Sequence, residues 1–274
     1  MSLYKLTAFP KTEFGGNEAG VYLDADNLTK KEMLKIAKEV NFSETAFVMK
    51  SNKADFRVRF FTPLHEIDLC GHATIATFNL LRDLKIIKEG TYTQETKVGI
   101  LDLIVKKNEV YMGQPLPKFY GFLEYNELNT CFSNRHFVSD DLPIQVVSTG
   151  MKEIFLPVKD VETLNNLKPN FEEIIEFSIK HNVIGIHAFA LSDEVDAYGR
   201  NFAPIVGINE ESATGTSNGA LGCYLYEYVK KKKEYILRQG YSMNLPSEIK
   251  TNLEYKDNAI TKVFVGGSAR LITE

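Results

Sequence analysis

Hydrophobic and polar positions alternate along the chain with two periods, one typical of helices and the other of strands. Apolar residues recur at helical spacing between Met33 and Val40, directly after the capping-box pattern Thr29-Lys-Lys-Glu32. This pattern predicts a surface helix from about Thr29 to Val40. In Ala54–Phe60, aromatic and aliphatic residues instead alternate with arginines, which predicts a half-buried, antiparallel strand.

Three further helices and a series of strands are expected. Ala73–Leu84 is apolar on almost every side, which is typical of a buried helix, and Thr216–Lys230 carries core leucines and tyrosines at helical spacing. Phe171–His181 is amphipathic and predicts a second surface helix. The other expected strands are Tyr4–Phe9, Val21–Leu23, Thr45–Met49, Gly99–Val105, Glu109–Met112, Gln145–Ser148, Ile154–Pro157, Val183–Leu191, Asp196–Phe202 and Ile260–Leu271.

The chain repeats one short design. Arg59-Phe-Phe-Thr-Pro63 and Arg200-Asn-Phe-Ala-Pro204 share an Arg-x-Phe-x-Pro pattern. Each is followed by a glycine at the start of a buried helix, within Cys70–Thr74 in the first half and Thr214–Asn218 in the second. Such internal similarity indicates two copies of one supersecondary unit. Prolines between the strands place the junction near Pro115–Gly121.

Composition narrows the classes of function. The chain has 274 residues, is 44% hydrophobic and 25% charged, and carries a formal charge of −4. We therefore expect no nucleic-acid partner, because a basic excess is missing. No sequence window resembles a membrane span, and we expect a cytoplasmic protein. The three cysteines are scattered, which favours neither a disulfide framework nor a structural zinc site.

The two buried helices begin at small, polar clusters. The first turn of a helix leaves N–H groups without partners and carries partial positive charge, so it can bind an anion. Gly71 and Gly215 would allow a ligand to approach the backbone closely. We expect the two helix starts, related by a pseudo-twofold axis, to hold a small carboxylate substrate between the halves.

Candidate proton carriers lie near both helix starts. Glu44 stands between apolar neighbours, where burial would raise its pKa toward a value useful in acid/base catalysis. His72 lies within the first helix start, and Glu210 and Glu211 precede the second. Two helix N-termini could stabilise the negative charge that develops when a glutamate removes a proton. Such chemistry would need neither a metal nor a cofactor.

Five motifs, in order along the chain, resemble the phenazine biosynthesis PhzF-like family: Phe14-Gly-Gly-Asn-Glu-Ala19, Ser43-Glu-Thr-Ala-Phe47, Phe61-Thr-Pro63, Asp68-Leu-Cys-Gly-His-Ala-Thr74 and Gly207-Ile-Asn-Glu-Glu-Ser-Ala-Thr-Gly-Thr216. The resemblance implies a diaminopimelate epimerase-like α+β fold, with two pseudo-twofold-related halves that each wrap an antiparallel sheet around a central helix. We expect halves at 1–117 and 118–274, the last strand returning to the first half. The resemblance also implies an isomerase without cofactor or metal, usually a homodimer.

The resemblance assigns roles to individual residues. Glu44 matches the catalytic acid/base of the family, which would move a proton within a small carboxylate-bearing substrate. The substrate-binding positions that it implies are Asn17, Ser43, Gly71, His72, Glu211, Gly215 and Thr216. Glu211 stands where the family usually has aspartate, Thr216 where it has serine, and Leu245 where arginine is common. These departures leave the phenazine substrate open.

Three other functions are compatible with parts of the pattern. The fold could serve a catalytically silent carboxylate-binding protein. It could also serve an amino-acid epimerase, although that chemistry uses a cysteine at each helix start and here only Cys70 is present, with Thr214 at the second position. A metal or thiol hydrolase is disfavoured because Cys70 and His72, two residues apart in one helix start, should point in different directions.

Overall fold

The computed structural model describes residues 3–272, which form a mixed α/β fold with extensive sheet and few helices. The described residues divide into two compact units. Those up to Gly113 and from Gly266 onward form the first unit, and Gln114–Val265 form the second. The chain thus leaves the first unit within one strand and returns to it within another. No helix in the described part of the chain is both long and apolar enough to cross a membrane.

The first unit consists mainly of short strands, nearly all of them before residue 113. Its strands are β1 (Leu3–Ala8), β2 (Asn17–Tyr22), β3 (Glu44–Met49), β4 (Phe56–Phe61), β5 (Glu66–Ile67), β6 (Gly90–Thr96), β7 (Gly99–Val105), β8 (Val110–Gln114) and β18 (Ala269–Leu271), and its helices are the 3₁₀ turn η1 (Ala25–Asn27), α1 (Lys30–Val40) and α2 (Gly71–Asp83). The helix expected from the capping box is confirmed, because Thr29 and Glu32 make both reciprocal hydrogen bonds at the start of α1.

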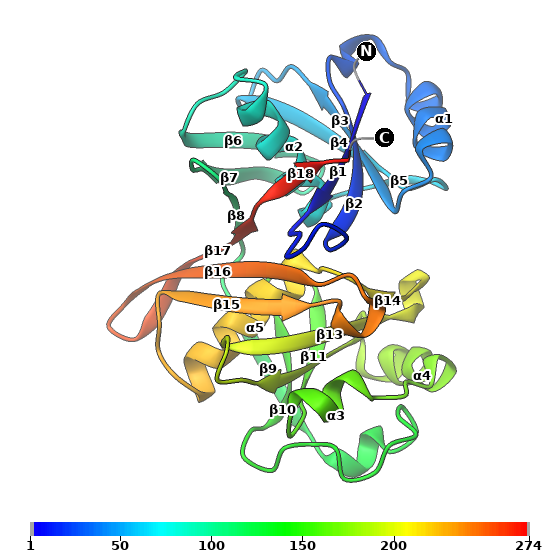
Figure 1. The fold of residues 1–274 in the computed structure, drawn as a ribbon, viewed down its shortest axis with the longest axis vertical. Coiled ribbons are helices and arrows are strands. Elements are labelled where there is room, and N and C mark those ends of the chain that lie inside the picture. Colours follow the sequence, from blue (N-terminus) through cyan, green and yellow to red (C-terminus); the bar gives the residue numbers. More distant parts are fainter. Residues whose placement is uncertain (1–2, 273–274) are drawn as a thin grey trace. The chain divides into compact units, whose positions relative to one another are not determined.

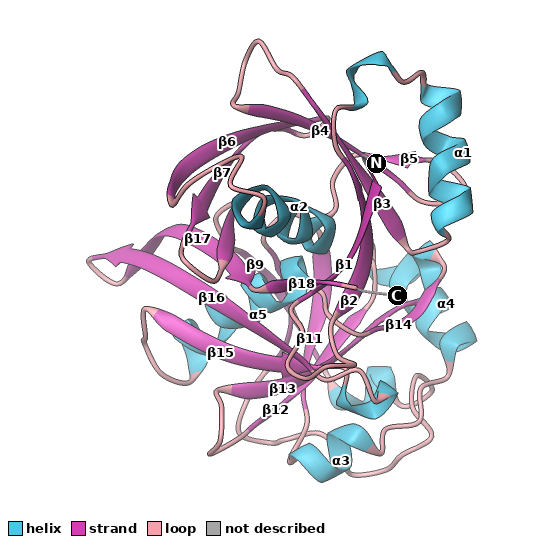
Figure 2. Ribbon diagram, turned by 45° about the horizontal axis from the view of Figure 1, so that its top comes forward, coloured by secondary structure: helices cyan, strands magenta, loops and turns pink. Residues whose placement is uncertain are grey.

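Helix α2 is the centre of the first unit. All of its residues from His72 to Leu81 are buried, as its apolar sequence predicts. The helix packs against β1, β2, β3, β7 and β18, and Figure 2 shows it among these magenta strands. Strand β18, red in Figure 1, pairs antiparallel with β1, so that the end of the described chain completes the sheet begun by its first strand.

The second unit combines a sheet with helices on both faces. Its elements are β9 (Lys118–Leu123), η2 (Tyr125–Leu128), β10 (Ile144–Ser148), β11 (Lys152–Pro157), α3 (Val161–Asn165), α4 (Phe171–His181), β12 (Ile186–Leu191), β13 (Ala197–Ala203), η3 (Pro204–Val206), β14 (Ile208–Glu211), α5 (Gly215–Tyr228), β15 (Glu234–Gln239), η4 (Tyr241–Met243), β16 (Ser247–Lys256) and most of β17 (Ala259–Gly267).

Burial of this sheet on both faces explains its apolar strands. Ile154 belongs to the core that also contains α3 and α4, whereas its neighbour Phe155 belongs to the core around α5. Successive side chains of a strand point to opposite faces, so a strand covered on both sides is apolar at nearly every position. Helix α5 is buried over most of its length, which confirms that its leucines and tyrosines are core residues.

The two units share one internal pattern of strand pairing. β2 pairs parallel with β3, which pairs antiparallel with β4. In the same way, β11 pairs parallel with β12, which pairs antiparallel with β13. The expected antiparallel pairing therefore holds for most strands but not for these, because helices between β2 and β3 and between β11 and β12 permit parallel crossovers. The arginines of the repeated Arg-x-Phe-x-Pro pattern also make the same contact in both units, since Arg59 stacks on Phe61 and Arg200 on Phe202.

Candidate active site

The start of α2 brings together side chains from three segments of the first unit. β2 begins at Asn17 and β3 at Glu44, and these strands run parallel with Ala19 opposite Glu44. Helix α2 packs against both strands, with His72 as its second residue. Asn17, Glu44 and His72 are all buried. Residues that are distant in the sequence thus form one polar cluster in an otherwise apolar core.

His72 contacts each of the other predicted side chains of this cluster. Its Nε2 lies 3.2 Å from Glu44 Oε2, an ion-pair distance. The hydroxyl of Ser43 lies 3.5 Å from the same nitrogen. On the other side of the ring, Asn17 Nδ2 lies 3.3 Å from Nδ1. The imidazole ring is therefore contacted at both nitrogens, and the carboxylate of Glu44 lies on the Nε2 side.

Cys70 also belongs to the cluster, contrary to the expectation from its spacing. Its Sγ lies 3.4 Å from His72 Nδ1 and 3.8 Å from Nε2. The argument that these two side chains must diverge is wrong, because Cys70 is the N-cap of α2 and has extended rather than helical backbone angles. Donor atoms of Glu44, Cys70 and His72 all lie within 4.8 Å of one another, so these residues could hold a metal ion.

The electrostatics of Glu44 differ from the sequence-based expectation. Burial raises the pKa of Glu44, but a hydrogen bond and the positive charge of His72, helped by Ser43 and Cys70, lower it more. The net pKa of Glu44 therefore lies below its ordinary value of 4.5. The expected rise is wrong because it considered burial without the partner on α2. Glu44 is accordingly a carboxylate at neutral pH.

The protons of the cluster lie on the histidine and the cysteine. Burial lowers the pKa of His72, but contacts with Cys70 and Glu44 raise it well above the ordinary value of 6.5. Burial, and then the charge of Glu44, raise the pKa of the Cys70 thiol to about 11. Because this thiol is neutral near pH 7, the anion that stabilises the imidazolium of His72 is Glu44. The directions of the pKa shifts thus favour a carboxylate on Glu44 and a proton on His72 beside a neutral thiol.

The two buried helices begin without a side-chain capping hydrogen bond from the N-cap residue. Neither Cys70 at α2 nor Thr214 at α5, both within the described residues, makes a side-chain capping hydrogen bond. Gly71 and Gly215 are the first residues of these helices, so neither adds a side chain over the backbone there; Gly71 is partly exposed, whereas Gly215 is buried. Each helix start therefore has the features of an anion-binding site within its own unit.

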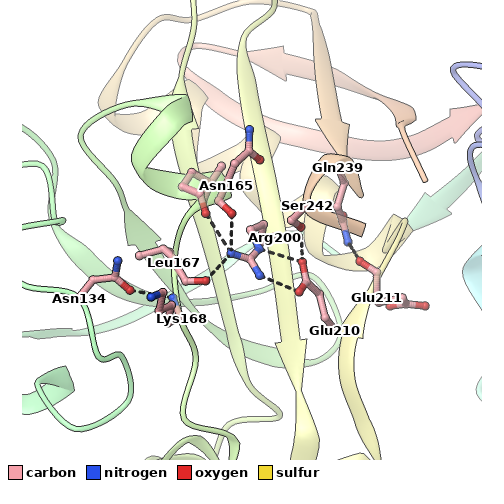
Figure 3. A network of polar contacts seen from close by, with 10 residues as sticks. Asn134, Asn165, Leu167, Lys168, Arg200, Glu210, Glu211, Gln239 and Ser242 are labelled. Atoms are coloured by element: carbon pink, nitrogen blue, oxygen red, sulfur yellow. Dashed lines mark hydrogen bonds and ion pairs between the residues drawn. The ribbon is translucent and has the colours of Figure 1, made fainter. Parts of the chain in front are cut away.

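In the second unit, Glu211 is tied to the start of α5. The hydroxyl of Thr214 donates a 2.6 Å hydrogen bond to Glu211 Oε2. Gln239 Nε2 donates to the backbone oxygen of Glu211 at 2.7 Å, as Figure 3 shows, and to Thr214 Oγ1 at 3.1 Å. Thr216, in the first turn, accepts a hydrogen bond at its carbonyl from Thr149. The predicted residues Glu211, Gly215 and Thr216 thus lie together.

Glu210 has a different task from its neighbour Glu211. Figure 3 shows it in a two-pronged ion pair with Arg200, whose Nε and Nη2 each lie 2.8 Å from a carboxylate oxygen. Ser242 donates a further hydrogen bond of 2.6 Å to Glu210. Both carboxylate oxygens of Glu210 therefore bind side chains that hold β13 and β14 in place.

Sequence reasoning missed one buried carboxyl group beside the start of α5. Glu153 on β11 accepts a 2.8 Å hydrogen bond from Asn201 Nδ2, which also lies 3.1 Å from the hydroxyl of Ser217. Burial raises the pKa of Glu153 to about 7, although Ser217 and Asn201 lower it in part, and the charge of Glu211 adds to the rise. A lone glutamate in the apolar strand 152–157 was the available signal.

The structure groups the predicted site residues into two sets. Asn17, Ser43, Glu44, Gly71 and His72 lie around the start of α2, and the other three lie around the start of α5. Each set lies within one unit, and each contains a helix N-terminus and a carboxylate. That both sets contact one substrate stays a prediction.

Known proteins resemble the chain over almost all of its length. The sequence model of a family described as "Phenazine biosynthesis-like protein" matches residues 6–274. An uncharacterized isomerase of Clostridium acetobutylicum is 36% identical, with 87% of each chain covered. The trans-2,3-dihydro-3-hydroxyanthranilate isomerase of Pseudomonas aeruginosa is 25% identical, covering 98% of this chain and 96% of its own.

Solved structures show the same similarity in three dimensions. The crystal structure of a PhzF-family phenazine biosynthesis protein from Bacillus anthracis superposes with a TM-score of 0.90. It is 32% identical and covers all of this chain, with 98% of its own length matched. The resemblance found in five sequence motifs therefore extends to the whole fold.

Proposed function

The chain belongs to the phenazine biosynthesis-like protein family, and from this premise we propose an isomerase that moves a proton within a small carboxylate-bearing substrate. Glu44 is the acid/base in this proposal. The observation that carries it is the buried contact of 3.2 Å between Glu44 and His72 at the start of α2. Relatives across the chain's length bear the name isomerase, which supports the class of reaction.

The proposed reaction begins with the carboxylate of Glu44. It takes a proton from a substrate carbon, whose electron pair moves into the conjugated system that includes the substrate carboxylate. The protonated Glu44 exchanges this proton with solvent and then delivers a proton to a second carbon. Because the pKa of Glu44 lies below 4.5, the carboxylate is a weak base and the negative charge on the substrate must be stabilised strongly. The N-terminus of α2, with its partial positive charge, and the imidazolium of His72 are suited to this stabilisation.

Each other residue of the first cluster has a supporting part in this mechanism. Ser43 at Nε2 and Asn17 at Nδ1 hold the ring of His72 and fix its orientation toward Glu44; for the imidazolium, the Asn17 amide turns so that its oxygen accepts from Nδ1–H. Gly71 gives the substrate carboxylate access to the backbone of α2. Cys70 stays a neutral thiol and supplies no base. No second thiol stands at the start of α5, since Thr214 is its N-cap and donates its hydroxyl to Glu211.

The substrate class is a small carboxylate with an acidic C–H bond. The P. aeruginosa relative is named for trans-2,3-dihydro-3-hydroxyanthranilate, so this compound is the first candidate. Glu211 and Thr216 differ from the usual aspartate and serine of the family motif. These changes lie beside the start of α5, where they would alter substrate choice without removing Glu44. The proposal therefore specifies the type of reaction, and specifies the substrate only by its chemical class.

Deuterium exchange tests the proposed chemistry. Wild-type protein would be incubated in deuterium oxide with dihydro-hydroxyanthranilate and a panel of small cyclic and amino carboxylic acids, and followed by proton NMR. We expect deuterium at a substrate carbon with the wild type and a rate about 10²–10⁴-fold lower with Glu44→Gln, the usual contribution of a general acid/base. Glu18→Gln, an exposed glutamate on β2, is the matched control and should exchange normally.

Two outcomes would count against the isomerase. Equal exchange by wild type and Glu44→Gln would remove Glu44 from the chemistry. Binding of a carboxylate without any exchange, unchanged by Glu44→Gln, would favour the catalytically silent carboxylate-binding protein instead.

A further inference from the structure

Glu153 is a buried acid without a charged partner. It lies on β11, is only 3% exposed, and contacts the amide of Asn201 and the hydroxyl of Ser217. Within residues 3–272 no cation contacts it, whereas Glu210 is paired with Arg200. A buried carboxylate without a counter-charge is costly, so its surroundings favour the neutral acid.

The neighbours of Glu153 can serve both its neutral and its ionised form. Asn201 Nδ2 lies 2.8 Å from Glu153 Oε1, 3.1 Å from Ser217 Oγ and 3.2 Å from His187 Nδ1. An amide nitrogen has only two protons, so at least one of these contacts takes its proton from elsewhere. The Ser217 hydroxyl can donate to the carboxylate or accept from the protonated acid. A proton can therefore enter or leave with little movement of the side chains.

The groups that surround Glu153 provide no positive charge at neutral pH. His187, from β12, is neutral there because burial lowers its pKa to about 3. Val147, opposite Glu153 on β10, is apolar, and α5 contributes the neutral hydroxyl of Ser217. Burial raises the pKa of Glu153 to about 7 against the hydrogen bonds of the cluster, and the charge of Glu211 adds to the rise. The charge of Glu153 therefore changes near neutral pH.

Ser217 connects Glu153 to the start of α5. The amide of Asn218 bonds to the carbonyl of Thr214, so the N–H groups of 215–217 precede the first intrahelical bond and have no acceptor within the helix. A carboxylate bound there would lie roughly 6–9 Å from the carboxyl group of Glu153, since one hydrogen bond lies on each side of the serine. At that distance, a charge on Glu153 opposes anion binding, whereas the neutral acid does not.

We propose that the start of α5 binds the substrate carboxylate together with one proton, and that Glu153 is the positioning residue that takes up this proton. The proton comes from solvent and returns to it when the anion leaves, so no bond of the substrate changes in this step. Because the start of α5 is a carboxylate site only in the proposed function, the coupling rests on that function. The affinity for the anion should rise as the pH falls through 7.

Anthranilate tests the coupling without turnover. It is the aromatic relative of dihydro-hydroxyanthranilate, so it has no saturated carbon that Glu44 could deprotonate, and its carboxylate stays ionised from about pH 6 to about pH 8. Fluorescence titration of the full chain should show an affinity about 5–10-fold higher at pH 6 than at pH 8. Calorimetry at pH 7, in buffers of different ionisation enthalpy, should show uptake of about 0.5 proton per anthranilate bound. This measurement needs no variant.

Glu153→Gln keeps the shape and polarity of the neutral acid. This variant should bind anthranilate equally well at both pH values, with the affinity that wild type has at the lower one, and without proton uptake. Glu254→Gln, at an exposed glutamate on β16, is the matched control and should keep the pH dependence of wild type.

Three results would overturn the proposal. These are a pH dependence that persists unchanged in Glu153→Gln, binding to wild type without proton uptake, and no binding of anthranilate at either pH. The test also separates this proposal from the isomerase. If deuterium exchange does not depend on Glu44 but anthranilate binding remains coupled to Glu153, the proton-coupled site stands and the isomerase is wrong. If exchange depends on Glu44 but anthranilate binds wild type equally at both pH values, the isomerase stands and the coupling is wrong.

Discussion

The side chain of Glu44 acquires its properties from residues that are remote in the sequence. Burial alone would make it a weak acid, yet His72, from the start of α2, holds it as a carboxylate. The reverse influence keeps His72 charged. The two residues therefore titrate as one pair. Replacing either residue should change how the stability of the protein depends on pH.

His72→Gln tests this coupling through stability. Glu44 has a lowered pKa, so its contribution is present above 4.5 and is lost as the pH falls through its folded pKa. His72 has a raised pKa, so its contribution is present below 6.5 and is lost as the pH rises through its folded pKa. In urea denaturation between pH 4.5 and pH 6.5, wild type should be more stable than His72→Gln by about 3 kcal/mol. The difference should be smaller at lower and at higher pH. A difference that is independent of pH would contradict the pairing.

The pKa of Glu153 is shifted in the opposite direction to that of Glu44, so its contribution to stability changes with pH in the opposite sense. Its pKa is raised from 4.5 to about 7, so its favourable contribution is complete below 4.5 and is lost as the pH rises toward 7. The free energy of unfolding of the wild type should lose about 3 kcal/mol from this group across that interval. Glu153→Gln keeps the shape and should remove this loss in denaturation measured at several pH values. Glu254→Gln, an exposed glutamate on β16, should leave it intact.

At the scale of elements, the arginines of the two Arg-x-Phe copies form the same kind of ion pair, but Arg200 is more buried and makes more hydrogen bonds than Arg59. In both, the arginine of a central strand forms a two-pronged ion pair, Arg59 with Glu66 and Arg200 with Glu210. Arg200 does more, because its Nη1 also donates to backbone oxygens at Leu164, Asn165 and Leu167 (Figure 3). It thereby joins the end of α3 to the sheet.

Lysine substitution should separate these two arginines. Arg200→Lys loses several hydrogen bonds in a buried place and should lower the free energy of unfolding by about 3 kcal/mol. Arg59→Lys should lower it by only about 1 kcal/mol, since Arg59 is more exposed and two lysines, Lys30 and Lys97, also contact Glu66. Chemical denaturation of both variants measures the difference. Equal losses would mean that the carbonyl contacts add little.

The sequence predicts elements better than it predicts their partners. The capping box and the apolar stretches predict α1, α2 and α5 because these signals are local. The parallel pairing of β2 with β3 depends on a crossover through α1 and leaves no mark in either strand. The same limit applies to the site. Motifs identified Glu44 and His72, but the lowered pKa of Glu44 and the buried Glu153 depend on contacts between distant segments.

At the scale of the whole molecule, the first unit is discontinuous. The amide of Phe9 donates to Ser268, and the amide of Ile272 donates to Lys5, so residues after β17 close the edge of β1. The second unit is continuous in sequence and has its own cores. Loss of the final strand should therefore weaken one unit and spare the other. That the protein forms a homodimer stays a prediction, which light scattering can check.

A chain ended after Val265 tests this division. Hydrogen exchange followed by mass spectrometry should show peptides of β1 exchanging roughly tenfold faster or more than in the full chain, because an edge that was paired becomes open. Peptides of β12 should keep their protection. Equal acceleration in both would show that the second unit depends on the final strand as well.

The late pairing of β18 with β1 also has a consequence for synthesis on the ribosome. Ala269 pairs with Ala8, and 261 residues separate them (269 − 8). At about 5–20 residues per second, roughly 13–50 s pass between the translation of these two positions. During that time the second unit can be completed, while the outer edge of β1 waits without its partner. An open strand edge invites pairing with other chains, so nascent copies of this protein should be most vulnerable to aggregation, and most in need of a chaperone, in that interval.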